Sequence, residues 1–321
     1  MHLLWKKGFV VKDNLELGLD NPVLDTIFSH AHGDHKVKNP VIFSKETGEI
    51  IGKQGYSWGE KITYDSFEIS MFPSGHVLGA AQFLVENGSS LVFTGDLRFS
   101  DSFFFRKPKV LKGDYLIIEA TYGRKEFNFP TMEEIFENFK TWVNENLDKS
   151  LLCGAYPYGK AQEVVYMLNK LGIVPVVHPE VYKYCELYSK FGYSLKYGYP
   201  DCENMKKRFV AVVPPRLLDR SFIRILEKQT NTEVLPAIFT GWALKFRFGM
   251  KTFPLSDHAD YEQLLNYVSE AKPREVITHH GFAKDLAKSI TEELGIKAKP
   301  FEDLKSTFST LTLGNHQQNV T

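Results

Sequence analysis

Short apolar stretches separated by turn residues fill the first third of the chain and predict a region of β-strands. Phe9–Val11 and Leu15–Leu19 flank Asp13-Asn14, a pair of residues typical of a hairpin turn. Val23–Phe28 is predicted as a strand that is buried on both faces. The same pattern predicts four more strands: Lys61–Met71, Ala81–Glu86, Ser90–Thr94 and Tyr115–Glu119.

The pattern then changes to apolar positions at helical spacing that alternate with short apolar runs. Pro130–Glu134 has the residues of a capping box before an amphipathic helix to about Leu147, and Lys160–Leu171 is a predicted helix ending at Gly172. This alternation predicts a parallel α/β unit. The strands of this unit are predicted at Leu151–Ala155, Val174–Val177, Phe209–Val213 and Val234–Phe239. After the unit, the pattern predicts helix Asp260–Ala271, strand Glu275–Thr278 and helix Ala283–Leu294.

Composition narrows the class of protein. The length of 321 residues suggests two domains, and 43% hydrophobic with 24% charged residues is typical of a folded protein. Equal numbers of basic and acidic side chains, 39 each, exclude a uniformly positive surface but allow a local basic groove. Three cysteines without CxxC spacing, no secretory leader and no run of about 18 apolar residues predict a cytoplasmic protein without a membrane span.

The strongest chemical signal is the segment Ser29–His35, which reads SHAHGDH and directly follows a predicted strand. Imidazole with carboxylate suits Zn²⁺, and Mn or Fe also fit such donors. If the loop opens into a helix, His30 and His32 face one ion, whereas Asp34 and His35, in the first helical turn, face a second. The alternative is a histidine-rich surface loop.

Further candidate ligands follow at the ends of later strands. His76 lies in a glycine-flanked loop, Asp96 follows Leu91–Phe93, and the doublet His279-His280 ends another strand. A carboxylate at position 96 can bridge two ions because each oxygen can serve one of them. Alone, each residue has a plainer interpretation: a structural histidine, a turn aspartate, or a core histidine for one of the doublet. The segment Ser256–Asp260 opens a helix, where one aspartate is expected as the N-cap.

Together these motifs resemble the metallo-β-lactamase superfamily, and IEATYG, YPYGKAQE, FTGWA and LSDHAD resemble its β-CASP branch of nucleases. The resemblance is to the compact bacterial and archaeal exonuclease-like members, both the ligase-associated DNA exonucleases and the proteins similar to mRNA 3′-end-processing factors. The resemblance implies an αββα sandwich built from residues 1–121 and 249–310. It also implies an α/β β-CASP domain inserted at 122–248 and a polar tail at 311–321.

The resemblance also assigns roles to individual residues. Two Zn²⁺ ions are implied, one held by His30, His32, His76 and Asp96 and the other by Asp34, His35, Asp96 and His280. Asp20 is implied to orient the ligand loop without touching metal. Glu119 and His258 are implied to pair near the scissile phosphate, with His258 as the proton donor and a hydroxide between the ions as the nucleophile.

Two segments are candidate contacts to substrate. Gly159 and Lys160 begin a predicted helix, where exposed amides and a positive charge suit a phosphate. Thr240-Gly241-Trp242 offers loop amides and an aromatic ring that can stack on a base. The alternatives are a solvated lysine and a core tryptophan.

The expected function is hydrolysis of nucleic-acid phosphodiester bonds, as an exonuclease on single-stranded DNA, with RNA as the other substrate. Two alternatives are kept: a small-molecule hydrolase of the thioesterase or lactamase type, and an inactive scaffold. The sequence leaves the direction of cleavage and the oligomeric state open.

Overall fold

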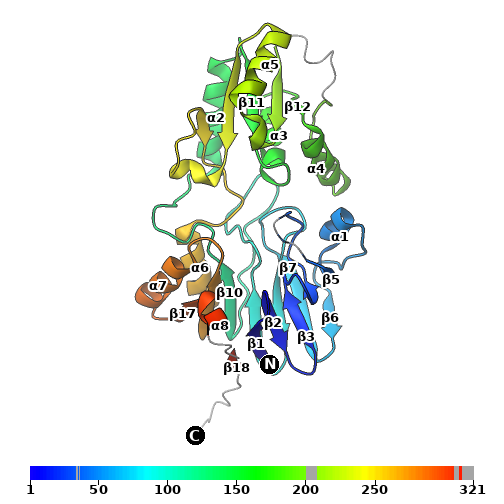
Figure 1. Ribbon diagram of the computed structural model, residues 1–321, viewed down its shortest axis with the longest axis vertical. Helices are drawn as coiled ribbons and strands as arrows, with labels where there is room; N and C mark the ends of the chain where they lie inside the picture. Colours follow the sequence, from blue (N-terminus) through cyan, green and yellow to red (C-terminus); the bar gives the residue numbers. More distant parts are fainter. Residues whose placement is uncertain (34, 36, 200–207, 307–310, 313–321) are drawn as a thin grey trace. The chain divides into compact units, whose positions relative to one another are not determined.

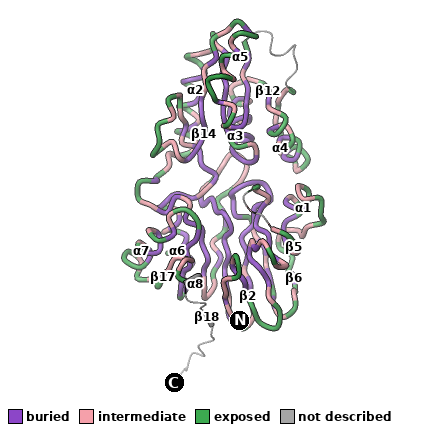
Figure 2. Tube along the Cα trace, in the orientation of Figure 1, coloured by how far each residue is buried: buried purple, intermediate pink, exposed green. Residues whose placement is uncertain are grey.

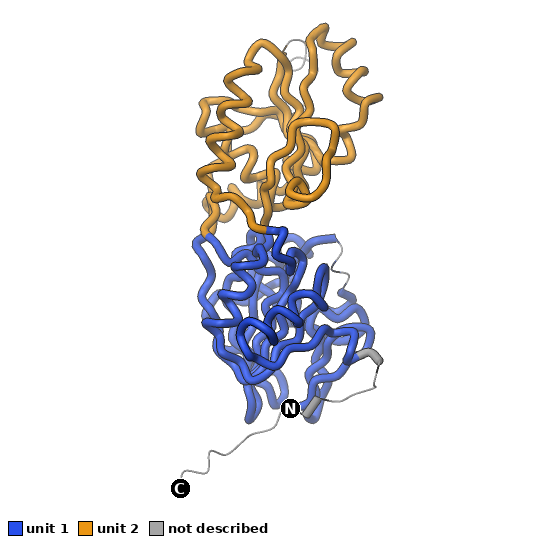
Figure 3. Tube along the Cα trace, turned by 90° about the vertical axis from the view of Figure 1, so that its left-hand side faces the viewer, with its two compact units in different colours: residues 1–100, 106–127, 258–321 blue, residues 101–105, 128–257 orange. Residues whose placement is uncertain are grey.

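The computed structural model describes residues 1–33, 35, 37–199, 208–306 and 311–312. The chain divides into two compact units (Figure 3), of which unit 2 comprises residues 101–105 and 128–257 and unit 1 the rest. The joints therefore lie later than the predicted 121/122 and 248/249. The amide of Tyr261 donates to the carbonyl of Phe127 at 3.1 Å, which keeps residues before 128 with unit 1. Strand β15 (Lys251–Phe253) pairs with the sheet of unit 2 and keeps its neighbours there.

Unit 1 is a sandwich of two sheets (Figure 1). In the described residues the first sheet has the order β18 (Leu311–Thr312), β1 (His2–Trp5), β2 (Phe9–Lys12), β3 (Glu16–Leu19), β4 (Asp25–Ile27), β5 (Asn39–Ile42). The second has the order β17 (Lys297–Pro300), β16 (Glu275–His279), β10 (Tyr115–Glu119), β9 (Ser90–Phe93), β8 (Ala81–Glu86), β7 (Phe67–Pro73), β6 (Lys61–Tyr64). The predicted α/β sandwich is confirmed.

Alternating side chains of the second sheet build two different cores, as the period of two in a strand requires. Leu91, Phe93 and Ile117 face the first sheet, whereas Val92 and Leu116 pack with the helices on the outer face. Those helices are α6 (Tyr261–Ala271) and α7 (Ala283–Leu294), while α1 (Lys45–Ile51) and α8 (Glu302–Ser306) complete unit 1. Figure 2 shows the buried residues following the strands and the exposed residues following the outer surfaces of the helices.

Two strand predictions in unit 1 need correction, and part of the predicted polar tail is a strand. Lys61–Met71 is not one strand but the hairpin β6–β7, because the chain turns at Asp65, whose φ is 53°. Val23–Phe28 shortens to β4. In the predicted polar tail, residues 311–312 pair with β1 as a strand, and 313–321 lie outside the described residues.

Unit 2 is a parallel α/β unit, as predicted. Its described strands have the order β12 (Val176–Val177), β13 (Val210–Val213), β11 (Ser150–Gly154), β14 (Val234–Phe239), β15, and each pair is parallel. Its helices are α2 (Met132–Glu145), α3 (Lys160–Lys170), α4 (Pro179–Lys190) and α5 (Arg220–Thr230), with short 3₁₀ turns at Pro215–Leu217 and Gly241–Leu244. The predicted capping box before α2 is confirmed, because Thr131 and Glu134 exchange side-chain to backbone hydrogen bonds.

Residues 101–105 belong to unit 2 through their aromatic rings. The ring of Phe104 lies 5.4 Å from Tyr166, 5.2 Å from Tyr188 and 5.4 Å from Tyr193. Residues 101–105 therefore pack into unit 2, although residues 106–127 of unit 1 separate them in sequence from the rest of that unit. Among the described residues, no helix is long and apolar enough to span a lipid bilayer.

Candidate metal centre

The candidate ligands converge because four strands of the second sheet point the same way. β9, β10 and β16 are mutually parallel, and β7 runs in their direction because it is antiparallel to β8, which is antiparallel to β9. The carboxyl ends of all four strands therefore meet at one edge of the sheet. His76 follows β7, Asp96 follows β9, Glu119 ends β10 and His280 follows β16. The loop after β4, in the facing sheet, carries the histidine motif to the same edge.

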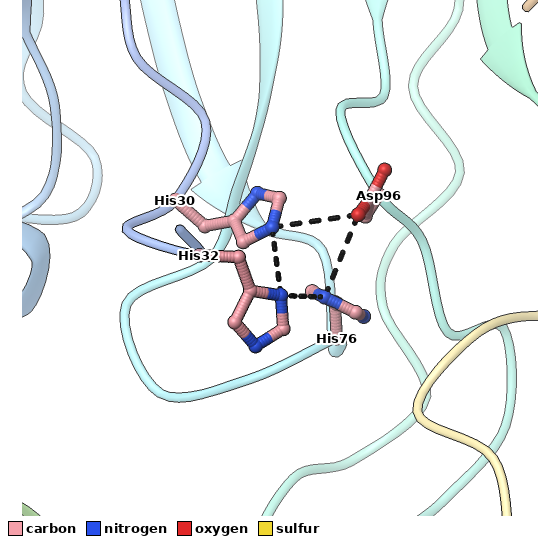
Figure 4. A group of neighbouring side chains, drawn as sticks. All are labelled: His30, His32, His76 and Asp96. Atoms are coloured by element: carbon pink, nitrogen blue, oxygen red, sulfur yellow. Dashed lines mark hydrogen bonds and ion pairs between the residues drawn. The ribbon is translucent and has the colours of Figure 1, made fainter. Parts of the chain in front are cut away.

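Four side chains form the first ligand group (Figure 4). His32 Nδ1 lies 3.1 Å from His30 Nε2 and 3.1 Å from His76 Nε2. Asp96 Oδ2 lies 3.4 Å from His30 Nε2 and 3.6 Å from His76 Nε2. Ligands about 2.0–2.1 Å from a tetrahedral zinc ion are separated by about 3.3–3.4 Å, close to these spacings. Three nitrogens and one oxygen at these distances fit a zinc ion.

Hydrogen bonds outside the group fix which nitrogen of His30 faces the ligands. The Ser29 hydroxyl has a single hydrogen, which it donates to Asp20 Oδ2. Its 2.9 Å contact with His30 Nδ1 therefore requires Nδ1–H as the donor, which leaves Nε2 with its lone pair toward the other ligand atoms. Burial, followed by the charge of His35, holds the pKa of His30 well below its usual range, so this imidazole is neutral.

The second ligand group shares Asp96 with the first. His35 Nε2 lies 3.5 Å from Asp96 Oδ2, and His280 offers a further nitrogen to the same group. Asp20 holds the other side of the His35 ring through Nδ1 at 3.2 Å, as in a carboxylate–histidine–metal relay. Burial alone would lower the pKa of His35, but Asp96 and Asp20 outweigh it and raise this pKa to about 11. The two carboxylates thus make a position that favours positive charge.

The helical turn expected at Asp34 and His35 is not seen at His35. Asp34 lies outside the described residues, and those described between 31 and 38 contain no helix. The amide of His35 instead donates to the carbonyl of His32 at 3.1 Å, which closes a turn at Gly33. The chain must then enter β5 at Asn39, and the residue before a proline, here Pro40, avoids the helical region.

The structure separates the two histidines of the doublet. His279 is the last residue of β16, is buried, and contacts the rings of Phe9 and Phe93 at 5.5 and 5.9 Å. Burial is the main reason why the pKa of His279 lies well below its usual range. His280 leaves the strand with a φ of 60°, is exposed, and belongs to the second ligand group.

Glu119 and His258 form a pair beside the ligands. Glu119 is fully buried, and its Oε1 lies 2.8 Å from His258 Nδ1. The same carboxylate accepts the amides of Leu97 at 2.9 Å and Thr121 at 3.0 Å, so three donors fix it. The ring of His258 lies 4.5 Å from that of His76. His258 is thus oriented by Glu119 at the border of the first ligand group.

The backbone after Asp96 connects the other segments of the site. The amide of Leu97 donates to the carboxylate of Glu119, and the carbonyl of Leu97 accepts the amide of Ala259 at 2.6 Å. The amide of Arg98 donates to the carbonyl of Ser74 at 3.0 Å. Gly95 has φ 53°, and a Cβ there would lie 2.5 Å from Ser29 Cβ. The motif "GD" therefore needs its glycine for close packing against the histidine loop. No sequence motif predicts the roles of Ser29 and Leu97, and the available signal is that each is adjacent to a motif residue.

Two of the amides expected to be free at the start of α3 already have acceptors within the chain. The amide of Gly159 donates to Gln162 Oε1 at 2.8 Å, and that of Ala161 donates to the carbonyl of Tyr156 at 3.1 Å. Lys160 is buried and forms an ion pair with Asp257, so the solvated alternative is wrong. A phosphate contact would compete with this ion pair, and a role of Lys160 or Gly159 in substrate binding stays a prediction.

The segment Thr240–Trp242 forms a capped turn in unit 2. Thr240 is buried, and its hydroxyl accepts the amide of Trp242 at 3.3 Å. Gly241 is also buried, whereas Trp242 is half-buried with its ring 5.8 Å from Phe246. Trp242 is therefore not a core tryptophan, and contact of Thr240, Gly241 and Trp242 with substrate stays a prediction. The expected N-cap aspartate is Asp260, which accepts the amide of Gln263 at 2.9 Å.

We expect Lys160→Met to lower the free energy of unfolding by about 3 kcal/mol, because removing one partner strands a buried charge on the other. The side chains of Lys160 and Asp257 are 8% and 2% exposed, so solvent screens the pair weakly. Urea unfolding and hydrogen exchange of α3 peptides measure the loss. The control is Lys140→Met, which breaks an exposed ion pair with Glu137 and should change little. Equal effects of the two substitutions would contradict a structural role of the buried pair.

The sequence of this chain is similar to those of known proteins. The family described as "Zn-dependent metallo-hydrolase RNA specificity domain" matches residues 244–299. A "Probable DNA ligase" of Opitutus terrae is 28% identical over 314 residues, which cover 87% of this chain and 30% of the ligase. An "Uncharacterized protein in lig 3'region" of Acidianus ambivalens is 34% identical over 125 residues, 37% of this chain and 84% of that protein.

More distant relatives extend the comparison. The "RNase aCSPSF2" of Saccharolobus solfataricus is 23% identical over 292 residues, 75% of this chain and 58% of that enzyme. The chain thus spans less than two thirds of this RNase and of the ligase. A solved structure of a protein of unknown function from Enterococcus faecalis V583 shares the fold, with a TM-score of 0.62 at 15% identity over 86% of this chain and 78% of that one. By its fold and by these relatives, the chain belongs to the β-CASP branch of the metallo-β-lactamase superfamily.

Proposed function

We propose that the chain is a metal-dependent nuclease that hydrolyses phosphodiester bonds of single-stranded DNA from an end. The observation that carries the proposal is the position of Asp96 Oδ2, which lies 3.4–3.6 Å from ring nitrogens of His30, His35 and His76. One carboxylate is therefore shared by two groups of ligands. Sites with two ions are a common solution for displacement at phosphorus.

The chain's own residues would hold two ions. His30, His32, His76 and Asp96 would hold one, and His35, Asp96 and His280 the other, with Asp34 as the further ligand that the family implies. Bound there, Zn²⁺ supplies Lewis acidity to a phosphodiester, and Mn or Fe also suits nitrogen and oxygen donors.

His258 would supply the proton that the departing oxygen needs. Its Nδ1 is held by Glu119, so Nε2 is the nitrogen able to donate. Glu119 therefore orients the ring of His258. The metal ligands would hold the ions, and the pair of Glu119 and His258 would supply the proton.

The choice of DNA rests on the relatives. The alignment with the O. terrae protein, named a probable DNA ligase, extends over most of this chain, and a nuclease joined to a ligase would act on the polymer that the ligase seals. The family match over residues 244–299 and the RNase relative favour RNA instead. Substrates of both kinds therefore belong in the test.

Metal removal is the direct test. Protein dialysed against a chelator should lose all turnover of 5′- and 3′-labelled single-stranded DNA, and added Zn²⁺ or Mn²⁺ should restore it, with mononucleotides as the first products. RNA is the parallel substrate, and nitrocefin and S-lactoylglutathione test the small-molecule alternative. Turnover of those compounds without cleavage of either polymer would contradict the proposal. Purified protein with about zero metal and no turnover would identify an inactive scaffold.

A further inference from the structure

A cavity of about 430 Å³ in unit 1 opens beside the metal centre. Its lining includes the ligands His32 and His35, so the cavity and the two ligand groups share walls. Most other lining side chains are apolar, with Ile50 and Ile51 from the end of α1 among them. The exceptions are Lys38 and Lys53, which are exposed. Neither lysine has an ion-pair partner among the described residues.

The wall made by α1 is fixed to the loop that carries His76. Ser44 caps α1, and its hydroxyl donates to the carbonyl of Gly79 at 2.7 Å, as that of Thr47 does at 3.1 Å. Gly79 has φ 80°, and a Cβ there would lie 2.7 Å from Glu46 Cβ. These contacts fix the distance between the apolar wall and the loop of the candidate ligand His76, as the positioning of a substrate requires.

The lining indicates the chemistry of the occupant. Its volume lies at the small end of the range for ligand sites, roughly 300–1,000 Å³, which suits a single nucleotide. Apolar side chains can contact the faces of a base and sugar without reading a sequence. Two exposed lysines in the lining suit a phosphate, and in a chain of zero net charge such local groups dominate attraction of an anion.

We infer that this cavity holds the nucleoside next to the scissile phosphate, with Lys38 and Lys53 binding the following phosphate of the strand. The inference rests on the proposed nuclease function and deepens it. A substrate seated there presents its phosphodiester to the side where His32 and His35 face the ligand groups. The contacts are to sugar, base face and phosphate, so this subsite accepts any base.

The test compares two substrates and two readouts. Lys53→Ala and Lys38→Ala should each lower kcat/KM for a single-stranded oligonucleotide about tenfold relative to kcat/KM for bis(4-nitrophenyl) phosphate, which has no following phosphate. Anisotropy of a labelled oligonucleotide on chelator-treated protein should show weaker binding for each variant, and the slope of log K against log[salt] should fall by about 0.7 when both lysines are replaced, because they share one phosphate. Ile51→Trp, which fills the cavity, should raise KM for the oligonucleotide at least fivefold.

Lys45→Ala is the matched control, because this lysine is exposed at the other end of α1 and does not line the cavity. This substitution should leave kcat/KM for both substrates and the slope of log K against log[salt] unchanged. Unchanged binding and salt slope in Lys38→Ala and Lys53→Ala, with both substrates still hydrolysed, would overturn the subsite and leave the nuclease intact. Binding that depends on the lysines, without hydrolysis of either substrate, would instead refute the proposed function and support the subsite.

Discussion

Asp96→Ala should abolish hydrolysis and reduce bound metal below that of any single histidine variant. The carboxylate touches both ligand groups, so its loss removes a ligand from each. Lewis acidity supplies several kcal/mol to the reaction, and each 1.4 kcal/mol is about tenfold in rate, so we expect a loss of at least about 10³-fold. Labelled oligonucleotide cleavage and elemental analysis of the purified variant measure the two effects.

Asp96→Asn separates charge from shape in this experiment. Burial alone would raise the pKa of Asp96, but the charge of His35 outweighs it and holds this pKa well below its usual range, so the native side chain is an anion. Asparagine keeps the volume but lacks the negative charge, and should therefore fail like alanine while remaining folded. Asp148→Ala removes an exposed carboxylate of unit 2 and serves as the control. Native turnover and metal content in Asp96→Asn would exclude Asp96 from the centre.

His258→Ala should keep both ions and slow cleavage of an oligonucleotide by about 10²–10⁴-fold, the usual contribution of a general acid. The same variant should turn over bis(4-nitrophenyl) phosphate nearly as fast as the native protein, because a nitrophenolate leaves without a proton. The ratio of the two rates is the measurement, together with metal analysis. Loss of metal in this variant would show that His258 is a ligand, a role that its position beside His76 allows.

Glu119→Gln is the companion substitution. The native carboxylate accepts from Leu97, Thr121 and His258, whereas an amide has one acceptor oxygen and would turn its NH₂ group toward at least one of these donors. We expect a loss of activity similar to that of His258→Ala, accompanied by lower stability, since a buried donor loses its partner. A fully stable and active Glu119→Gln would contradict the role assigned to the pair.

The grouping of the candidate ligands was largely predictable from sequence, because most of them directly follow strands. A ligand that directly follows an apolar strand can be placed at the end of that strand, as for His76 and Asp96, without knowledge of the rest of the fold. The doublet at 279 and 280 needed the structure, since both residues are histidines and only the packing of Phe9 and Phe93 distinguishes the core position.

What sequence could not provide are contacts between distant segments. Lys160 and Asp257 are 97 positions apart, and each alone has the pattern of a helix-start lysine or an N-cap aspartate. Their pairing in the interior of unit 2 follows from the fold, as does the cavity between the histidine loop and α1.

The pairing of β10 with β16 has a consequence for synthesis of the protein. Tyr115 pairs with Glu275 across the whole of the inserted unit, so the second sheet of unit 1 stays incomplete until the residues that follow unit 2 have left the ribosome. Unit 2, including the aromatic rings of 101–105, is fully synthesised before that point and can fold first. During this interval β10 exposes an unpaired apolar edge, the kind of surface that promotes aggregation. His280 also arrives last, so a nascent chain cannot assemble the second ligand group before its sheet is closed.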